Sequence, residues 1–494
     1  MKKYISIIFA TLAMAGSSCK KDYLELSKNP NTPTVTTPNL LLSGALKTTA
    51  DIVNGGGYTQ YAAWIGYLSW STGFQPNVAL LSYQITSATY DLFTPLYGNL
   101  TNYSALAAST PEPYFQAISK IMTVFDYQAL VDNYNNVPYS QALKGTAVLN
   151  PKYDDGSAIY DDLMKQLDAA IVQIQGAPVG ALTPGTADIM YKGDMTKWLK
   201  FANTLKLRIA LRQSNIGAKT AALKAATNAT SALGYLDITN GAVVNPGYLN
   251  SDANGGQQSP LWRNYGYTQN GGATANNQQY QANTYGKNQL TANGDTRGFQ
   301  VYLPTNGVII SSDFGQTTPP PGGTVSKVGN GLLKSATMNA TIMSSSEALF
   351  LEAEAAKSGY ISGSDASLFN AGITASFTEL GVPGDAAGYI TANPYPTAVA
   401  NPLLSPAQLD ALQEKAIITE KWKALAVYGG FEAFNEFRRT GYPDNIPLSI
   451  FPGANPPNQL TRIPYPAVEY RTNAANVAAQ GTINVFTSKI FWAK

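Results

Sequence analysis

The residues best suited to chemistry lie in a stretch, residues 259–290, where aromatic side chains alternate with amides. Aromatic rings pack against the apolar face of a sugar, and planar amides pair with its hydroxyl groups, so a neutral glycan needs no charge for recognition. The candidate ligand-binding residues are Trp262, Asn264, Tyr265, Tyr267 and Tyr280. We expect the three tyrosines to be exposed because they lie among Gly and Asn, whereas Trp262 fits a structural role equally well.

A second aromatic group, Trp64, Tyr67 and Trp70, occurs at steps of three residues. Side chains at this spacing lie on one face of a helix. Large aromatic residues in such a stripe are more often core than ligand platform. We therefore expect these three residues to pack in the interior.

Carboxylates could instead support glycoside hydrolysis, which needs two of them facing one bond. Glu352 and Glu354 are two residues apart on an expected helix, so they point to nearly opposite sides. Apolar residues at helical spacing lead to Glu420 and would carry it inward. A buried carboxylate needs a cation, and we expect a structural ion pair with Arg438 or Arg439.

The composition excludes several classes of function. The chain has 494 residues, no histidine, one cysteine, and 33 basic against 31 acidic residues. Histidine-based catalytic relays and cysteine-based zinc cages are therefore impossible. The balanced charge disfavours nucleic-acid binding. Asp154 and Asp155 lack the alternating oxygen ligands of a calcium loop, so no metal or cofactor is assigned.

The first 18 residues have the three parts of a secretory signal peptide: basic Lys2 and Lys3, an apolar stretch, and small residues. The only cysteine, Cys19, follows directly and resembles the acylated cysteine of bacterial lipoproteins. Residues 19–38 then form the lipidated start and an extended tether. We expect a protein anchored to a membrane by lipid only; a secreted protein with an idle thiol is the alternative.

The rest of the chain, residues 39–494, is interpreted as one mainly α-helical domain. We expect helices to begin directly after the capping residues Asp155 and Asp194. A third helix is expected to begin at Glu347, with Ser344 as its cap in a capping box. Pairs of helices are expected within 114–176, 186–233, 345–381 and 406–440, and they suggest stacked two-helix units resembling tetratricopeptide repeats. Residues 236–343 and 382–405 are expected to be loop-rich insertions.

Several short stretches together resemble the SusD/RagB-like outer-membrane lipoproteins. Among them are NYNNVPYSQA at 133–142, NGDTR at 293–297, EAEAA at 352–356, residues 420–443, and RIPYP at 462–466. They run in order over nearly the whole mature chain. In the second stretch we interpret Arg297 as a structural match.

This resemblance implies a SusD-like fold of tetratricopeptide-like helix pairs with an irregular, loop-rich ligand-binding part. It also implies a non-catalytic role: the lipoprotein captures an oligosaccharide or peptide outside the cell and passes it to a SusC-like TonB-dependent β-barrel transporter. The implied location is the outer membrane, facing the exterior. Two alternatives stay open, an exported glycan hydrolase and a scaffolding helical-repeat lipoprotein.

Overall fold

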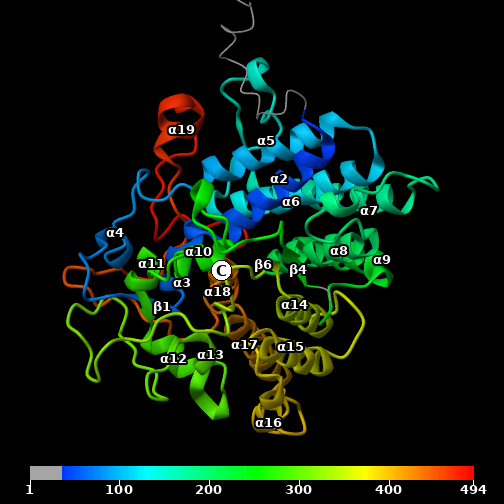
Figure 1. The fold of residues 1–494 in the computed structure, drawn as a ribbon. Helices are drawn as coiled ribbons and strands as arrows, with labels where there is room; N and C mark the ends of the chain where they lie inside the picture. Colours follow the sequence, from blue (N-terminus) through cyan, green and yellow to red (C-terminus); the bar gives the residue numbers. More distant parts are fainter. Residues whose placement is uncertain (1–35, 240) are drawn as a thin grey trace, which may run out of the picture.

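The computed structural model describes residues 36–239 and 241–494. The expected signal peptide, Cys19 and most of the tether therefore lie outside the described residues. The described chain is built mainly of helices that stack in layers, with a loop-rich part at one side (Figure 1). No helix in this part of the chain is both long and apolar enough to cross a membrane.

Helices of the first half form the upper layers in Figure 1. They are α2 (Pro38–Asn54), α5 (Phe93–Ser109), α6 (Pro113–Tyr134), α7 (Gly156–Gln175), α8 (Met195–Arg212) and α9 (Thr220–Thr230). Helix α6 packs against α7, and α8 packs against α9. The two pairs are stacked on each other through α7 and α8.

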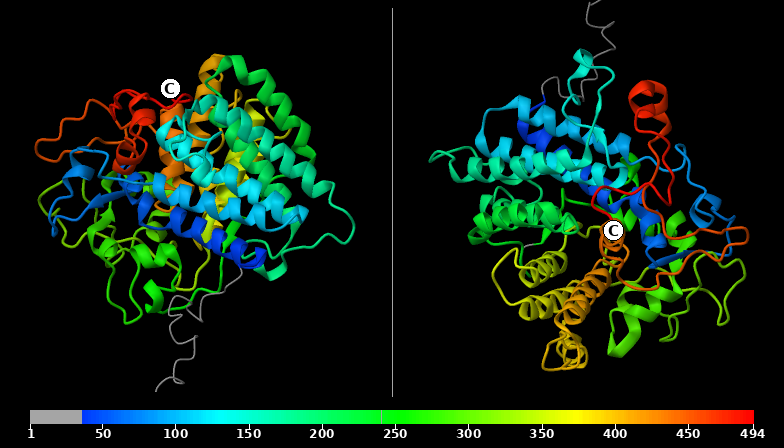
Figure 2. Two further views of the ribbon diagram at one scale, coloured as in Figure 1. Left: turned by 90° about the horizontal axis from the view of Figure 1, so that it is seen from above. Right: turned by 180° about the vertical axis from the view of Figure 1, so that it is seen from behind.

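Helices of the second half continue the stack. They are α14 (Ser345–Lys357), α15 (Asp365–Glu379), α17 (Pro406–Ala424) and α18 (Gly430–Thr440). Helix α14 contacts both α8 and α17, so it joins the two halves of the chain. The view from behind in Figure 2 shows the same order of layers. The expected mainly α-helical fold of stacked helix pairs is confirmed.

Polar side chains start the helices as the sequence predicts. Asp155 accepts a hydrogen bond from Ala158 N, and Asp194 accepts one from Thr196 N. Ser344 accepts one from Glu347 N at 3.0 Å, but α14 begins at Ser345, two residues earlier than expected. The expected return bond of a capping box is replaced, because the Glu347 carboxylate accepts from the Arg208 side chain.

The expected loop-rich stretches contain more regular structure than predicted. Residues 236–343 include four short helices, α10 (Pro260–Tyr265), α11 (Ala275–Gln279), α12 (Thr284–Thr291) and α13 (Gly298–Val301). Residues 382–405 include α16 (Ala386–Ala392). The remaining short helices are α3 (Thr59–Trp64), α4 (Val78–Leu81), α19 (Ala467–Thr472) and α20 (Ala474–Ala478). Helices this short are set by tertiary contacts rather than by a long apolar periodicity.

Three two-stranded antiparallel sheets connect distant segments. They pair β1 (Leu68–Trp70) with β5 (Tyr280–Ala282), β2 (Val137–Pro138) with β3 (Tyr153–Asp154), and β4 (Ala242–Val244) with β6 (Ala340–Met343). In the first sheet Trp70 lies opposite Tyr280, and Leu68 opposite Ala282. This pairing attaches the loop-rich part to the segment that follows α3.

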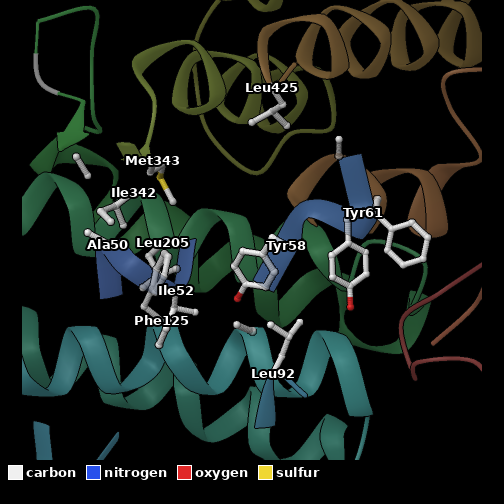
Figure 3. Packing of buried hydrophobic residues seen from close by; sticks show 14 of the residues in the cluster. Ala50, Ile52, Tyr58, Tyr61, Leu92, Phe125, Leu205, Ile342, Met343 and Leu425 are labelled. Carbon is white, nitrogen blue, oxygen red and sulfur yellow. The ribbon is translucent and has the colours of Figure 1, made fainter. Parts of the chain in front are cut away.

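The main core is one continuous cluster that runs from α2 to the last residues of the chain. Figure 3 shows Ile52 of α2, Phe125 of α6, Leu205 of α8 and Ile342 of β6 meeting at its centre. All four are buried. The core therefore joins helices from both halves of the chain.

The structure corrects the expected partner of Glu420. Its carboxylate lies 2.7 Å from Arg297 Nη2 and 3.1 Å from Lys423 Nζ, and it accepts a hydrogen bond from the Tyr389 hydroxyl. Arg297 is fully buried and also pairs with Asp295 at 2.8 Å, so the structural interpretation of Arg297 agrees with its environment. One cation, Arg297, comes from a segment 123 residues away in sequence, and the other, Lys423, lies three residues further along α17; neither comes from the following helix.

Arg438 and Arg439 make other contacts. Arg439 lies 2.7 Å from a Glu354 oxygen and also pairs with Glu436, its neighbour on α18. Arg438 donates to the backbone oxygens of Thr461 and Asp132. The expected pairing of Glu420 with either arginine is therefore wrong, because both guanidinium groups face other parts of the interior.

The close approach of α18 to α3 generates a first prediction. A Cβ at residue 430 would lie 2.7 Å from Ala62 N and 2.9 Å from Ala62 Cα, which are backbone atoms that cannot yield easily. We expect Gly430→Ala to lower the free energy of unfolding by about 1–3 kcal/mol, measured by urea denaturation.

Gly98→Ala is the matched control. Gly98 lies inside α5, and a Cβ there would meet no heavy atom within 4 Å. Alanine has the higher helix propensity, so this variant should gain up to about 1 kcal/mol. Equal effects of the two substitutions would contradict a tight α18–α3 contact.

The Glu420 ion cluster generates a second prediction. Burial alone would raise the pKa of Glu420, but the charges of Lys423 and Arg297 outweigh it and hold this pKa at about 2, against 4.5 for an ordinary Glu. Because the folded pKa is depressed, its stabilising contribution is present above pH 4.5 and lost as the pH falls toward 2. The difference corresponds to ~3 kcal/mol. Glu420→Gln should therefore be less stable at pH 7 in urea titrations, with the deficit shrinking toward pH 2.

The contribution of Glu352 to stability should depend on pH in the opposite direction, which the variant Glu352→Gln tests. Burial and the nearby Asp237 carboxylate raise the pKa of Glu352 to about 8. The neutral form is favoured in the folded state, so the stability that this group contributes is present below pH 4.5 and lost as the pH rises through 8. Glu352→Gln should be at least as stable as the parent at pH 7. A uniform loss in both variants would contradict these assignments.

Candidate functional site

Helix α10 positions the first of the candidate ligand-binding residues. Pro260 occupies its first turn, where a missing backbone N–H costs no hydrogen bond. Trp262 and Asn264 are partly exposed on this helix, whereas Tyr265 at its end is buried. Tyr267 follows after Gly266, outside the helix.

Tyr267 opens a small hairpin, residues 267–273, which we call the Tyr267 hairpin. Tyr267 and Ala273 form a β-bridge, and Thr268 N donates to Gly272 O at 2.8 Å. The hairpin exposes Gln269 and Asn270 at its tip, where Gln269 Oε1 accepts a hydrogen bond from Asp252 N at 3.3 Å. Its backbone bonds hold these side chains on the surface of the loop-rich part.

The rings of Trp262 and Tyr267 form a partly exposed pair. Their centroids lie 5.9 Å apart with tilted planes, and Trp262 Nε1 donates to Tyr267 O at 2.9 Å. Since the indole N–H is bonded internally, the exposed parts of the two rings offer carbon surfaces. Such surfaces suit the apolar face of a sugar.

Tyr267 also lines a surface pocket of ≈ 150 Å³, which we call the Tyr267 pocket. The other lining residues are Asp252, Gly255, Gly256, Gln258, Arg263, Thr268 and Thr274. Among the described residues that line it, Asp252 is the only carboxylate.

The two charged groups of this pocket are held by neighbours. Asp252 accepts hydrogen bonds from Gln258 Nε2 at 2.7 Å and from Gln269 N at 3.1 Å. Arg263 pairs with Asp51 at 3.0 Å and donates to Gly256 O at 3.1 Å. Both side chains thus brace the loop and tie it to α2, which makes the pocket largely preformed.

The expected exposure of Tyr265 and Tyr280 is wrong. Tyr265 is 2% exposed and Tyr280 is 7% exposed. The pairing of β1 with β5 draws Tyr280 inward against Trp70, with centroids 5.2 Å apart, and Tyr265 contacts Tyr280 edge to face at 6.3 Å. Burial raises the pKa of both hydroxyls. These rings form the floor of the loop-rich part.

Asn264 is partly exposed, but its amide is already engaged. Its Nδ2 donates to Thr59 Oγ1 at 3.2 Å, and its Oδ1 accepts from Asn276 Nδ2 at 2.5 Å. A ligand would have to compete with both bonds. This geometry favours a role in fixing α10 against α3 and α11.

Trp70 is less buried than the sequence reasoning expected, although it packs against the core. Trp64 and Tyr67 are buried as expected, but Trp70 is partly exposed at the end of β1. Its Nε1 donates to Gln75 O at 3.1 Å, beside Phe74, which is 38% exposed. Gly66, with φ of 86°, ends the helical turn before Trp70, and this glycine was the available signal that the helical spacing does not continue.

The arrangement offers binding chemistry rather than an acid–base pair. Hydrolysis of a glycoside needs two carboxylates about 5–10 Å apart across one bond. The described lining of the Tyr267 pocket supplies one carboxylate, that of Asp252, which accepts hydrogen bonds from Gln258 and Gln269. The described residues also contain no cluster of three or more side chains suited to hold a metal ion.

Solved structures with a similar fold are SusD homologues. One from Bacteroides uniformis aligns with a TM-score of 0.73 and 22% identity, covering 92% of this chain and 99% of that chain. A chitin-binding SusD homologue from Flavobacterium johnsoniae aligns with a TM-score of 0.74 and 22% identity, covering 91% of this chain and 98% of that chain. A third SusD homologue, from Bacteroides thetaiotaomicron, aligns with a TM-score of 0.72 and 20% identity, covering 93% of this chain and 99% of that chain.

A comparison with curated proteins finds no match. A SusD-like family profile described as "Starch-binding associating with outer membrane" matches residues 30–466, which is most of the chain. Sequence profile and fold thus agree with the ordered motifs noted above. The chain belongs to this SusD-like family of outer-membrane-associated proteins.

Proposed function

We propose that this protein captures an oligosaccharide at the cell surface and delivers it, chemically unaltered, to a TonB-dependent outer-membrane transporter. The observation that carries the binding role is the partly exposed Trp262–Tyr267 ring pair beside the Tyr267 pocket. The amides of Gln269 and Asn270 lie at the tip of the adjoining hairpin. Rings and amides together match the two faces of a sugar.

The two alternatives receive less support. A hydrolase would need a carboxylate pair, whereas the described lining of the Tyr267 pocket contains Asp252 alone. A purely scaffolding repeat protein would have no use for a preformed pocket with an exposed aromatic wall. We propose a sugar rather than a peptide because the family description names starch and one structural relative is called chitin-binding.

Delivery is proposed from the family relationship and from the amino terminus. The family associates with the outer membrane, and Cys19 is placed where lipoproteins carry their acyl chains. Acyl chains bury several CH₂ groups at about 0.8 kcal/mol each, which is enough for stable anchoring of a globular domain. We therefore propose an exterior-facing lipoprotein with a SusC-like barrel as its partner.

Titration calorimetry with chito- and malto-oligosaccharides tests the binding role. These probes are chosen because the family description names starch and one structural relative is called chitin-binding. We expect Tyr267→Ala to weaken binding about tenfold, since it removes an exposed aromatic contact worth about 1–2 kcal/mol.

Tyr470→Ala is the matched control, because Tyr470 is 43% exposed on α19, outside the Tyr267 pocket. It should leave the affinity unchanged. If both variants bound the glycan with equal affinity, the glycan-binding site would not include Tyr267. Release of reducing ends during the titration would contradict an unaltered ligand.

Isolation from native membranes tests delivery. Extraction in mild detergent followed by affinity capture should yield a complex with a TonB-dependent barrel, identified by mass spectrometry. Cys19→Ala should shift the protein from the membrane fraction to the soluble fraction, because the acyl anchor is lost. Repeated capture of the protein without any barrel would contradict the proposed partner.

A further inference from the structure

A second pocket, distinct from the Tyr267 pocket, is lined by residues of α18 and of the end of the chain. The end of the chain lies beside α18, where Lys494 N donates to Arg438 O at 3.0 Å (Figure 2). The volume of this second pocket is ≈ 300 Å³, twice that of the Tyr267 pocket, and the two share no lining residue. We call it the C-terminal pocket. It is lined by Phe437, Arg438, Gly441, Asn458, Gln459, Leu460, Thr461, Phe486, Lys489, Ala493 and Lys494.

The side-chain charges of this lining are all positive. Arg438, Lys489 and Lys494 contribute cations, and no Asp or Glu is among the described lining residues. Lys489 and Lys494 are exposed, and neither forms an ion pair within residues 36–239 and 241–494. Lys494 Nζ donates only to Thr440 O, at 3.2 Å.

Arg438 is a buried cation without a direct carboxylate partner. It is 7% exposed and donates to backbone oxygens of Thr461 and Asp132, at 2.7 Å and 2.6 Å. The carboxylate of Asp132 accepts from Trp492 Nε1 at 2.9 Å instead. Burial lowers the pKa of Arg438 to about 10, which still leaves it charged at neutral pH. The neighbouring Arg439 has carboxylate partners, whereas the buried Arg462 donates to the backbone oxygen of Tyr134.

Polar atoms of two buried lining residues lack partners among the described residues. They are Nε of Arg438 and Oε1 of Gln459, which is 8% exposed. Buried polar atoms are normally bonded, and exceptions mark places where a water molecule or ligand belongs. Phe437 and Phe486 add partly exposed rings to the same pocket. The pocket therefore combines aromatic, amide and cationic groups.

We propose that the C-terminal pocket binds the carboxylate of an acidic sugar, such as a uronic acid residue. Lys489 and Lys494 attract the carboxylate at the mouth, and Arg438 supplies positive potential from below. The rings of Phe437 and Phe486 suit the apolar face of the sugar. This inference goes beyond the proposed function, because it adds a second ligand site of different chemistry.

The lining favours a sugar over other anions. A phosphate or an acidic peptide would satisfy the cations but would leave the two phenylalanine rings without a ring face to stack on. A carboxylate held by several charge-assisted bonds should bind less tightly as the salt concentration rises.

Calorimetry of the full chain with trigalacturonic acid and with its fully methyl-esterified form tests the proposal, because the two probes share the same sugar rings and differ at the carboxyl groups, which are charged in the acid and uncharged methyl esters in the other probe. We expect the acid to bind at least tenfold more tightly than the ester, with affinity falling from 50 to 500 mM NaCl. The double variant Lys489→Gln, Lys494→Gln should bind the acid at least tenfold more weakly. Both lysines are exposed, so the variant should fold normally.

Lys165→Gln is the matched control, since Lys165 is exposed on α7 and outside the pocket. Its affinity for the acid should equal that of the parent. Equal binding of acid and ester, or no effect of the double variant, would overturn the proposal. Tighter binding of triglutamate than of trigalacturonic acid would overturn the assignment to sugars.

The two sites are tested separately. Tyr267→Ala should leave binding of trigalacturonic acid unchanged, and the double lysine variant should leave binding of neutral glycans unchanged. Loss of neutral-glycan binding in the double lysine variant would contradict two independent sites. Failure of the acidic-sugar experiment alone therefore leaves the Tyr267 site intact.

Discussion

The fold depends on a buried network of ion pairs where the helix pairs meet. Arg212 of α8 lies 2.6 Å from Glu436 of α18, and Lys421 of α17 lies 3.2 Å from the same carboxylate. Arg439 of α18 extends the network to Glu354 of α14. Removing one partner of such a pair costs about 3–5 kcal/mol, because the other charge is left buried and unpaired. Any other register of these helices would carry that cost several times over.

The network also determines where the loop-rich part lies. Trp422 follows Lys421 on α17, stacks on Tyr67 with centroids 4.5 Å apart, and donates from Nε1 to Ile65 O at 3.1 Å. The segment held in this way continues directly into β1, which pairs with β5 and brings Tyr280 against Trp70. A layer of aromatic rings therefore lies between the helices that carry the buried ion pairs and the candidate ligand surface.

Local signals made much of the helical scaffold predictable. Asp155 and Asp194 cap helices because their side chains bond backbone groups two or three residues away, a relation visible in sequence. Glu420 has one cation, Lys423, three residues away on the same helix, but its other partner, Arg297, was not predictable in this way because Arg297 reaches Glu420 only through the tertiary fold. The burial of Tyr265 and Tyr280 likewise follows from the pairing of β1 with β5, which joins segments more than 200 residues apart.

The amide-rich composition of the loops has two uses that sequence cannot separate. Asn277 Nδ2 donates to Tyr265 O at 2.6 Å and its Oδ1 accepts from Lys327 Nζ at 2.9 Å, so this amide cross-links the loop. Asn276 and Asn264 bond each other. At the tip of the Tyr267 hairpin, Asn270 is exposed, whereas the exposed Gln269 also accepts a hydrogen bond from Asp252 N. Since the same residue type both rigidifies the loop and faces solvent, the specificity of the surface depends on the few amides that the fold leaves outside, and a preformed loop lowers the entropy that a ligand would otherwise lose in ordering it.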